Sequence, residues 1–302
     1  MSEPAATIDI SIVLPVYNEA GHLRAEIDRI RLAMDASHYA YEIIVVDDGS
    51  DDGSGEALEH IDGIRLIRLP VNRGSGTARK VGTRESLGDI VVWTDVDMTY
   101  PNDRIPDLIK ELEGYDQVVG ARTSEQGTHK AMRVPAKWAI RKLAAYLANT
   151  DIPDLNSGFR AFRRDVAAQF LHLLPTGFSC VTTITMTFLA NGYTVKYVPI
   201  DYAPRAGESK FHWRKDTTRY LVQVVRLVLS YNPLRAFGPV FGLLAAVGFI
   251  KLGFDLADKA WRVPTNTLLI LFAAFQVLVI GLLADLVVRV TRPRDEVAGT
   301  GH

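Results

Sequence analysis

The chain has 302 residues, enough for one large domain or two smaller ones, each with a sizeable core. Its 34 Lys and Arg residues nearly balance 35 Asp and Glu residues, so the net charge of −1 excludes a protein that binds nucleic acid through an overall basic surface. The single cysteine, Cys180, excludes an internal disulfide framework and favours a reducing compartment. We expect it to be a packed small residue rather than a nucleophile.

The first two-thirds of the chain alternate short apolar runs with helical patterns. The runs that predict strands lie at residues 8–14, 41–46, 64–69, 90–94 and 117–119. The helical patterns between them lie at residues 20–34, 54–60, 77–86 and 105–112. Runs such as IIVV are apolar without alternation, as expected for strands that are covered on both faces. This order predicts an α/β fold with a mostly parallel, doubly wound sheet, in which ligands bind beyond the carboxyl ends of the strands.

The most unusual polar residues follow the predicted strand ends. LPVYNE follows the first strand, and VVDDGSDDG closes the second with a carboxylate pair and a tight turn. In these motifs Asp48 could accept hydrogen bonds from the N–H edge of a nucleobase, and Tyr17 could pack on the face of the base. For either motif alone, turn chemistry at a strand–helix junction is the simpler interpretation.

Two later motifs suit anionic ligands. NRGSGTARKVG, at residues 72–82, is a glycine-rich entry to a helix, and it offers backbone amides and Arg79 to anionic groups. VVWTDVDMTYP, at residues 91–101, ends an apolar strand with Asp95 and Asp97, one residue apart. Carboxylates this close repel each other. The pair is therefore either part of a polar turn and helix cap or a site for a divalent cation, which prefers hard oxygen ligands.

The composition becomes strongly apolar after about residue 211. Residues 216–230, DTTRYLVQVVRLVLS, carry a narrow polar stripe at helical spacing, which predicts a helix in a membrane interface or a heavily buried one. Of two apolar runs that follow, the second, at 268–288, is long enough to span a bilayer. The first, at 236–250, ends at Lys251 and spans only with snorkelling or tilt. A buried hairpin of a soluble protein is the alternative.

These features divide the chain into four expected parts. They are an N-terminal domain at 1–212, an amphipathic interfacial helix at 213–232, a transmembrane hairpin at 233–290 and a tail at 291–302. Arginines precede and follow the hairpin, whereas the connector between its two runs carries acidic residues as well. The positive-inside rule therefore predicts an integral membrane protein whose N-terminal domain and both termini are cytosolic. The N-terminus has neither the basic nor the apolar region of a signal peptide.

Together and in this order, the motifs resemble the family 2 glycosyltransferases with the GT-A fold. PVYNE, VVDDGSDDG and the D-x-D of Asp95, Val96 and Asp97 carry the resemblance. DLNSGFRAFRRDV, PRAGESKF and the C-terminal hairpin narrow it to the polyprenyl-phosphate glycosyltransferases, which include the dolichyl-phosphate mannose synthases. The resemblance covers roughly residues 8–290. It implies a Rossmann-like GT-A domain followed by an amphipathic helix and two transmembrane helices.

The resemblance also implies a site for a nucleotide-diphosphate sugar and a metal ion. The expected donor-binding residues are Pro15, Tyr17, Glu19, Val46, Asp48, Arg79, Asp95, Val96, Asp97, Arg122, Arg205 and Lys210. Asp95 and Asp97 would hold Mg²⁺ or Mn²⁺, which bridges the donor diphosphate and stabilises the leaving group as a Lewis acid. The chain departs from the family pattern at Thr99, where a glutamine ligand is common, and at Ser75, where a lysine is frequent.

A lipid phosphate acceptor changes the expected chemistry. Its oxygen is already anionic at neutral pH, so direct displacement with inversion at the anomeric carbon requires no general base. The expected catalytic residues are Asp97, Arg205 and Asp154. Asp154 would either position the donor sugar or act as a base, and a helix cap or turn is its structural alternative.

The cationic stretch at residues 128–150 can lie on an anionic leaflet, with a solvated helix face as its alternative. We expect Arg133 and Ser209 to contact the acceptor phosphate. The expected partners are the nucleotide sugar, a polyprenyl or dolichyl phosphate and the membrane, without nucleic acid, and a homo-oligomer stays open. GDP-mannose and UDP-glucose both stay open as donors. The alternatives are a membrane-anchored transferase that acts on a glycan acceptor and a non-catalytic nucleotide-sugar-binding membrane protein.

Overall fold

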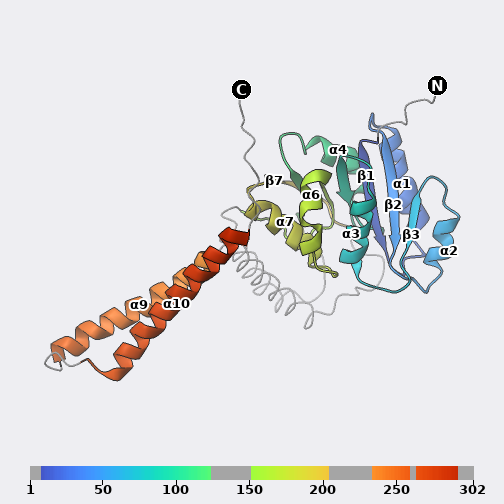
Figure 1. The fold of residues 1–302 in the computed structure, drawn as a ribbon. Helices are drawn as coiled ribbons and strands as arrows, with labels where there is room; N and C mark the ends of the chain where they lie inside the picture. Colours follow the sequence, from blue (N-terminus) through green and yellow to red (C-terminus); the bar gives the residue numbers. More distant parts are fainter. Residues whose placement is uncertain (1–7, 124–150, 204–232, 259–262, 292–302) are drawn as a thin grey trace. The chain divides into compact units, whose positions relative to one another are not determined.

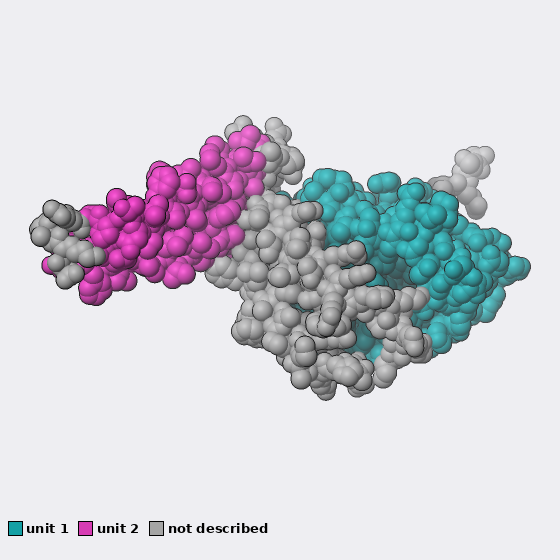
Figure 2. All heavy atoms as spheres, turned by 90° about the horizontal axis from the view of Figure 1, so that it is seen from below, with its two compact units in different colours: residues 1–223 teal, residues 224–302 magenta. Residues whose placement is uncertain are grey.

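The computed structural model describes residues 8–123, 151–203, 233–258 and 263–291. The chain divides into two compact units, Met1–Gln223 and Val224–His302, coloured separately in Figure 2 and described separately below. Several expected features lie outside the described residues: the cationic stretch, the interfacial helix, the polar tail beyond residue 291, Arg133, Arg205, Ser209 and Lys210.

In its described part, the N-terminal unit contains a seven-stranded sheet with the order β3-β2-β1-β4-β6-β5-β7 (Figure 1). The strands are β1 (Ile10–Val16), β2 (Tyr41–Asp47), β3 (Arg65–Arg68), β4 (Ile90–Trp93), β5 (Gln117–Arg122), β6 (Arg160–Arg163) and β7 (Val195–Ile200). β1 pairs in parallel with β2 and β4, β2 with β3, and β5 with β7. β6 is antiparallel to both of its neighbours. The expected mostly parallel α/β sheet is confirmed.

Helices cover both faces of this sheet, and the β1 side chains accordingly alternate between two buried clusters. Ile12 and Leu14 face a cluster shared with helices α1, α2 and α4, whereas Val13 faces a cluster shared with α3, α6 and α7. The helices are α1 (Leu23–Asp35), α2 (Ser54–Glu59), α3 (Ser75–Glu85), α4 (Ile105–Lys110), α6 (Arg164–Phe170) and α7 (Cys180–Ala190). Short 3₁₀ helices lie at Asn102–Arg104 and Leu171–Leu173. This two-faced covering is why the strand runs read as continuously apolar.

The described part of the C-terminal unit consists of two helices, α9 (Pro233–Asp258) and α10 (Thr265–Thr291). They pack as an antiparallel hairpin. This is seen from two contacts: Gly248 lies against Leu271, and Gly281 lies against Phe237. Both are long and apolar enough to cross a bilayer, with mean hydropathies of 1.8 and 2.6. Only 11% and 17% of these apolar segments is buried in the protein, so their outward faces favour a lipid environment over a soluble core.

One charged cluster interrupts the apolar surface near the connector of the hairpin. The Lys251 ammonium lies 3.1 Å from the carboxylate of Asp255, one turn further along α9. The Thr267 hydroxyl of α10 also donates a hydrogen bond to the buried Asp255 carboxylate. The lysine that ends the first apolar run in the sequence is therefore paired within the hairpin.

Candidate active site

The D-x-D motif lies in the loop that follows β4. The Thr99 hydroxyl donates a hydrogen bond of 2.5 Å to Oδ1 of Asp97, and both side chains are buried. Met98, between them, has a φ of +63°, so the backbone turns sharply at this point. The turn brings the hydroxyl back onto the carboxylate. Thr99 thus orients Asp97 in this structure, at the position where the family often has a glutamine.

The other aspartate of the motif is paired with the arginine of the glycine-rich helix entry. Nη2 of Arg79 lies 2.5 Å from Oδ1 of Asp95. The Arg79 side chain is only 3% exposed and lies over the Trp93 ring, 5.8 Å from its centroid. Burial, the largest single influence, would lower the pKa of Arg79, but Asp95, Cys180 and Tyr100 together outweigh it and the pKa is raised. A cation is therefore held directly against a predicted metal ligand.

Gly158, in the DLNSG motif, brings a third segment to this pair. A Cβ atom at this position would lie 2.9 Å from Oδ2 of Asp95 and 3.1 Å from Nη2 of Arg79. The Gly158 amide also donates a hydrogen bond of 2.7 Å to the hydroxyl of Tyr100. The motifs around residues 79, 95 and 158 are far apart in the sequence, yet they converge on one point beyond the end of β4.

Asp154, the first residue of DLNSG, is bound to Arg122 at the end of β5. Nε and Nη2 of Arg122 donate to the two carboxylate oxygens at 2.6 Å and 2.9 Å. The backbone amides of Arg122 and Asn156 donate to the same carboxylate at 3.2 Å and 2.9 Å. Burial would raise the pKa of Asp154, but these hydrogen bonds and the Arg122 charge lower it overall. Such a carboxylate is a weak general base.

The first two sequence motifs are joined by hydrogen bonds between their loops. The Asn18 side chain donates to Asp51 at 2.7 Å and accepts from the Asp51 amide at 3.0 Å. The Asn18 amide donates to the Ser50 hydroxyl, and the Glu19 amide donates to the Ser54 hydroxyl. The φ of Asn18 is +55°, which asparagine adopts more readily than most residues. Asn18, Ser50, Asp51 and Ser54 were not among the predicted site residues, although a polar side chain in each of two adjacent turns is a usable signal.

The predicted nucleoside-binding residues take different positions around these loops. Pro15, Tyr17 and Glu19 are half-buried at the end of β1. Val46 is fully buried and pairs with Pro15 in the sheet register. Val96 is also buried, in the apolar cluster on the α1 face. The two valine side chains therefore support the site from within the core.

Asp48 fixes the glycine-rich loop in place. Its two carboxylate oxygens accept hydrogen bonds from the backbone amides of Arg73, at 2.8 Å, and Gly74, at 2.7 Å. Burial raises the pKa of Asp48, and these amide bonds partly offset the increase. The loop is packed so closely that a Cβ atom at Gly74 would lie 2.5 Å from the carbonyl oxygen of Thr176. Asp48 thus links the second motif to the third.

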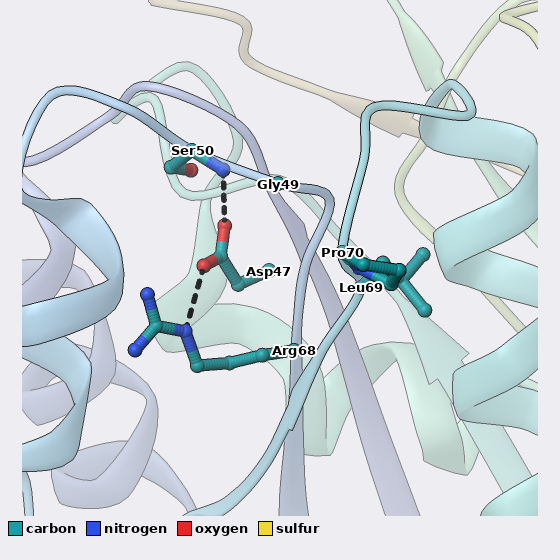
Figure 3. A pocket seen from close by; sticks show the side chains of 6 residues that line it. All are labelled: Asp47, Gly49, Ser50, Arg68, Leu69 and Pro70. Carbon is teal, nitrogen blue, oxygen red and sulfur yellow. Dashed lines mark hydrogen bonds and ion pairs between the residues drawn. The ribbon is translucent and has the colours of Figure 1, made fainter.

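The neighbouring aspartate, Asp47, lines a small pocket beside the turn that contains Gly49 and Ser50 (Figure 3). Its carboxylate accepts a hydrogen bond from the Ser50 amide at 3.0 Å and lies 3.5 Å from Nε of Arg68. Gly49, Leu69 and Pro70 complete the lining. The Asp47–Arg68 pair anchors the turn that carries Ser50, one of the residues joining the first two motifs.

The donor set at the D-x-D suits Mg²⁺ or Mn²⁺ bound together with a diphosphate. In the described ranges no group of three His, Cys, Asp or Glu side chains is arranged to hold a metal ion. The protein thus offers the two carboxylates of Asp95 and Asp97. Mg²⁺ is commonly bound through one or two carboxylates, with substrate phosphates and water completing its shell. The residues present therefore fit such an ion.

Comparisons with known proteins match two parts of the chain. Residues 11–171 match the sequence model described as Glycosyl transferase family 2, and residues 232–290 match the GtrB C-terminal hairpin. The undecaprenyl-phosphate 4-deoxy-4-formamido-L-arabinose transferase of Aeromonas hydrophila is 29% identical, over 94% of this chain and 91% of that protein. The enzyme of the same name from Shewanella sediminis is 30% identical, over 94% and 90%.

Solved structures show the same fold. Glucosyl-3-phosphoglycerate synthase from Mycobacterium tuberculosis, in complex with Mn²⁺, UDP-glucose and phosphoglyceric acid, superposes with a TM-score of 0.60 and 22% identity. The similarity covers 74% of this chain and 80% of that one. At this identity the likeness shows a common GT-A architecture and nothing more specific.

Proposed function

The chain belongs to glycosyl transferase family 2, and from that premise we propose that it transfers one sugar from a nucleotide-diphosphate sugar to the phosphate of a polyprenyl lipid. The observation that carries the proposal is the convergence of Asp95, Arg79 and Gly158 at the exit of β4, in a chain that ends in a membrane hairpin. The named function of the relatives, transfer to undecaprenyl phosphate, supports the lipid acceptor.

We propose that Asp95 and Asp97 hold Mg²⁺ or Mn²⁺, which neutralises charge on the departing nucleoside diphosphate when bound. The chain's own groups prepare this site. Thr99 fixes one oxygen of Asp97, and Arg79 fixes one oxygen of Asp95. Residues that hydrogen-bond to metal ligands commonly hold those ligands in the orientation that the metal requires.

The acceptor phosphate attacks without a protein base in this proposal. Its oxygen is anionic near neutral pH, so no proton has to be removed. Asp154 is bound at both oxygens by Arg122 and the amide of Asn156, and its pKa is lowered. We therefore assign Asp154 the role of holding the DLNSG loop, and with it Gly158, against Asp95.

The donor nucleoside is proposed to bind over Pro15, Tyr17 and Glu19, on the loops that Asn18 and Asp51 join. Asp48 contributes by holding the glycine-rich loop at the donor phosphates. Arg205 and Lys210 are proposed to contact the diphosphate, and Arg133 and Ser209 the lipid phosphate, from segments outside the described residues. The hairpin would keep the catalytic unit at the bilayer, with both termini cytosolic, where the lipid phosphate is available.

The proposal is tested by sugar transfer with the full chain in detergent. Radiolabelled GDP-mannose, UDP-glucose and the nucleotide-linked formamido-arabinose used by the relatives are offered with a polyprenyl phosphate and Mn²⁺ or Mg²⁺. We expect one donor to give an acid-labile lipid product that EDTA abolishes and that Asp97→Asn reduces by at least about a hundredfold. Labelling of a glycan instead, or donor binding without any labelled lipid, would overturn the acceptor assignment.

A further inference from the structure

Arg79 occupies an unusual position for a residue in a phosphate-binding motif. Its guanidinium points at Asp95, 2.5 Å away, and its side chain is almost completely buried between α3 and β4. The Trp93 ring lies beneath it, and Gly158 closes over it from the DLNSG loop. A side chain confined in this way acts on a ligand mainly through the carboxylate it holds.

The charge of Arg79 opposes that of a divalent cation at the same carboxylate. Two positive groups that share one carboxylate repel each other, and the repulsion between a guanidinium and a 2+ ion a few ångströms apart is large even in a high dielectric. With Asp95 neutralised by Arg79, the D-x-D presents a weaker field to a free cation than two unpaired aspartates would. A bound diphosphate restores the balance, because its negative charges attract the same cation.

We propose that Arg79 is a counter-ion that makes metal binding depend on the donor diphosphate. The residue positions Asp95 and, at the same time, keeps the affinity of the site for free metal low, so that metal and nucleotide sugar bind together. The inference rests on the proposed function, in that it assumes metal binding at Asp95 and Asp97. It differs from the sequence-based prediction, in which Arg79 contacts the donor anion directly.

The test measures Mn²⁺ binding to the full chain in detergent, by electron paramagnetic resonance of free Mn²⁺, with no nucleotide and with UDP or GDP. Arg79→Met removes the charge and keeps a long side chain, and Arg79→Gln is a second neutral variant in case the first does not fold. Arg79→Lys keeps the charge. Thr99→Val is the matched control, because it removes the orienting hydrogen bond on Asp97 without changing any charge.

The direction of the change in Mn²⁺ affinity tests the counter-ion role of Arg79. We expect the neutral Arg79 variants to bind Mn²⁺ alone at least about tenfold more tightly than the wild type, with a smaller further gain from nucleotide. Arg79→Lys should keep the weak nucleotide-free affinity, and Thr99→Val should not tighten it. Unchanged or weaker Mn²⁺ binding in the neutral variants would overturn the counter-ion role alone. A wild-type chain that takes up no Mn²⁺ even with UDP or GDP would overturn both the proposed metal site and this inference.

Discussion

Arg122 and Asp154 form a bidentate ion pair that joins the end of β5 to the DLNSG loop, with hydrogen bonds of 2.6 Å and 2.9 Å. Both side chains are largely buried, at 17% and 9% exposed, and the guanidinium also lies 5.2 Å from the centroid of the Tyr202 ring. The loop carries Gly158 four residues after Asp154, so this pair helps to hold Gly158 beside Asp95.

Removing one member of this pair should destabilise the catalytic unit. Arg122→Met leaves the Asp154 charge without its principal partner, and loss of one partner from a buried pair costs roughly 3–5 kcal/mol. We expect a clear fall in the melting temperature of the unit, measured by intrinsic fluorescence. The double variant Arg122→Met with Asp154→Leu should lose less than the sum of the single changes, because it leaves no buried charge behind. Additive losses would show that the two side chains do not interact.

The lowered pKa of Asp154 predicts the pH dependence of the pair. The ordinary aspartate value is 3.8, and the folded value lies below it. The stabilising contribution is therefore complete above about pH 5 and is lost only as the pH falls through the lowered folded value. The rate of sugar transfer should show no acidic limb from Asp154 between pH 5 and 8. An acidic limb in that range that disappears in Asp154→Asn would instead identify Asp154 as a general base.

The strands that frame the proposed donor site could be predicted because they are apolar on both faces and end in recognisable turns. β1, β2 and β4 lie within two residues of their expected ends. β6 was missed because it is four residues long and starts with Arg160, a fully buried charged residue that hides the apolar pattern. β7 was missed because Pro199 interrupts it, which is tolerated at the edge of a sheet.

The site residues were predictable as types but not in their pairings. Asp95 and Arg79 are both in recognisable motifs, yet sequence spacing says nothing about a contact across sixteen residues between a helix and a loop. The same holds for Arg122 and Asp154, for which the resemblance implies separate roles in donor binding and at the donor sugar. Tertiary packing decided which cation each carboxylate meets. Asn18 was passed over because its role depends on the facing loop around Asp51.

Asp48 gives a prediction that distinguishes two roles. Asp48→Asn keeps the shape of the side chain but presents an NH₂ group to one of two backbone amides, which loses one hydrogen bond and adds a repulsion. If Asp48 holds the glycine-rich loop, UDP and GDP should lose affinity by a similar factor, roughly tenfold for one lost charge-assisted bond. Isothermal titration with each nucleotide measures this. A change in the UDP-to-GDP ratio would show instead that Asp48 contacts the base.

Gly158 should tolerate no side chain. In Gly158→Ala the new Cβ atom would meet Oδ2 of Asp95 at 2.9 Å, a distance that forces the carboxylate to move. Displacing the proposed metal ligand in this way is expected to reduce metal affinity and sugar transfer about 10–100-fold. Gly21→Ala is the matched control, because a Cβ atom there meets nothing within 4 Å. Equal Mn²⁺ affinity, in the presence of nucleotide, for Gly158→Ala and the control would contradict the proposal that Gly158 lies beside a metal site.

The polar cluster of the hairpin should contribute to the packing of α9 on α10. Asp255 accepts hydrogen bonds from Thr267 of the facing helix and from Lys251 of its own. Polar contacts between membrane helices contribute on average about 0.6 kcal/mol and at most about 1.7 kcal/mol. Thr267→Val removes the contact between helices and should lower the thermal stability of the hairpin in detergent by a small, measurable amount. Thr265→Val, the same change at an exposed position of α10, is the matched control. The cluster acts within one helix if Thr267→Val and Thr265→Val melt together with the wild type, whereas a selective loss in Thr267→Val establishes Asp255 as the residue that joins the two helices.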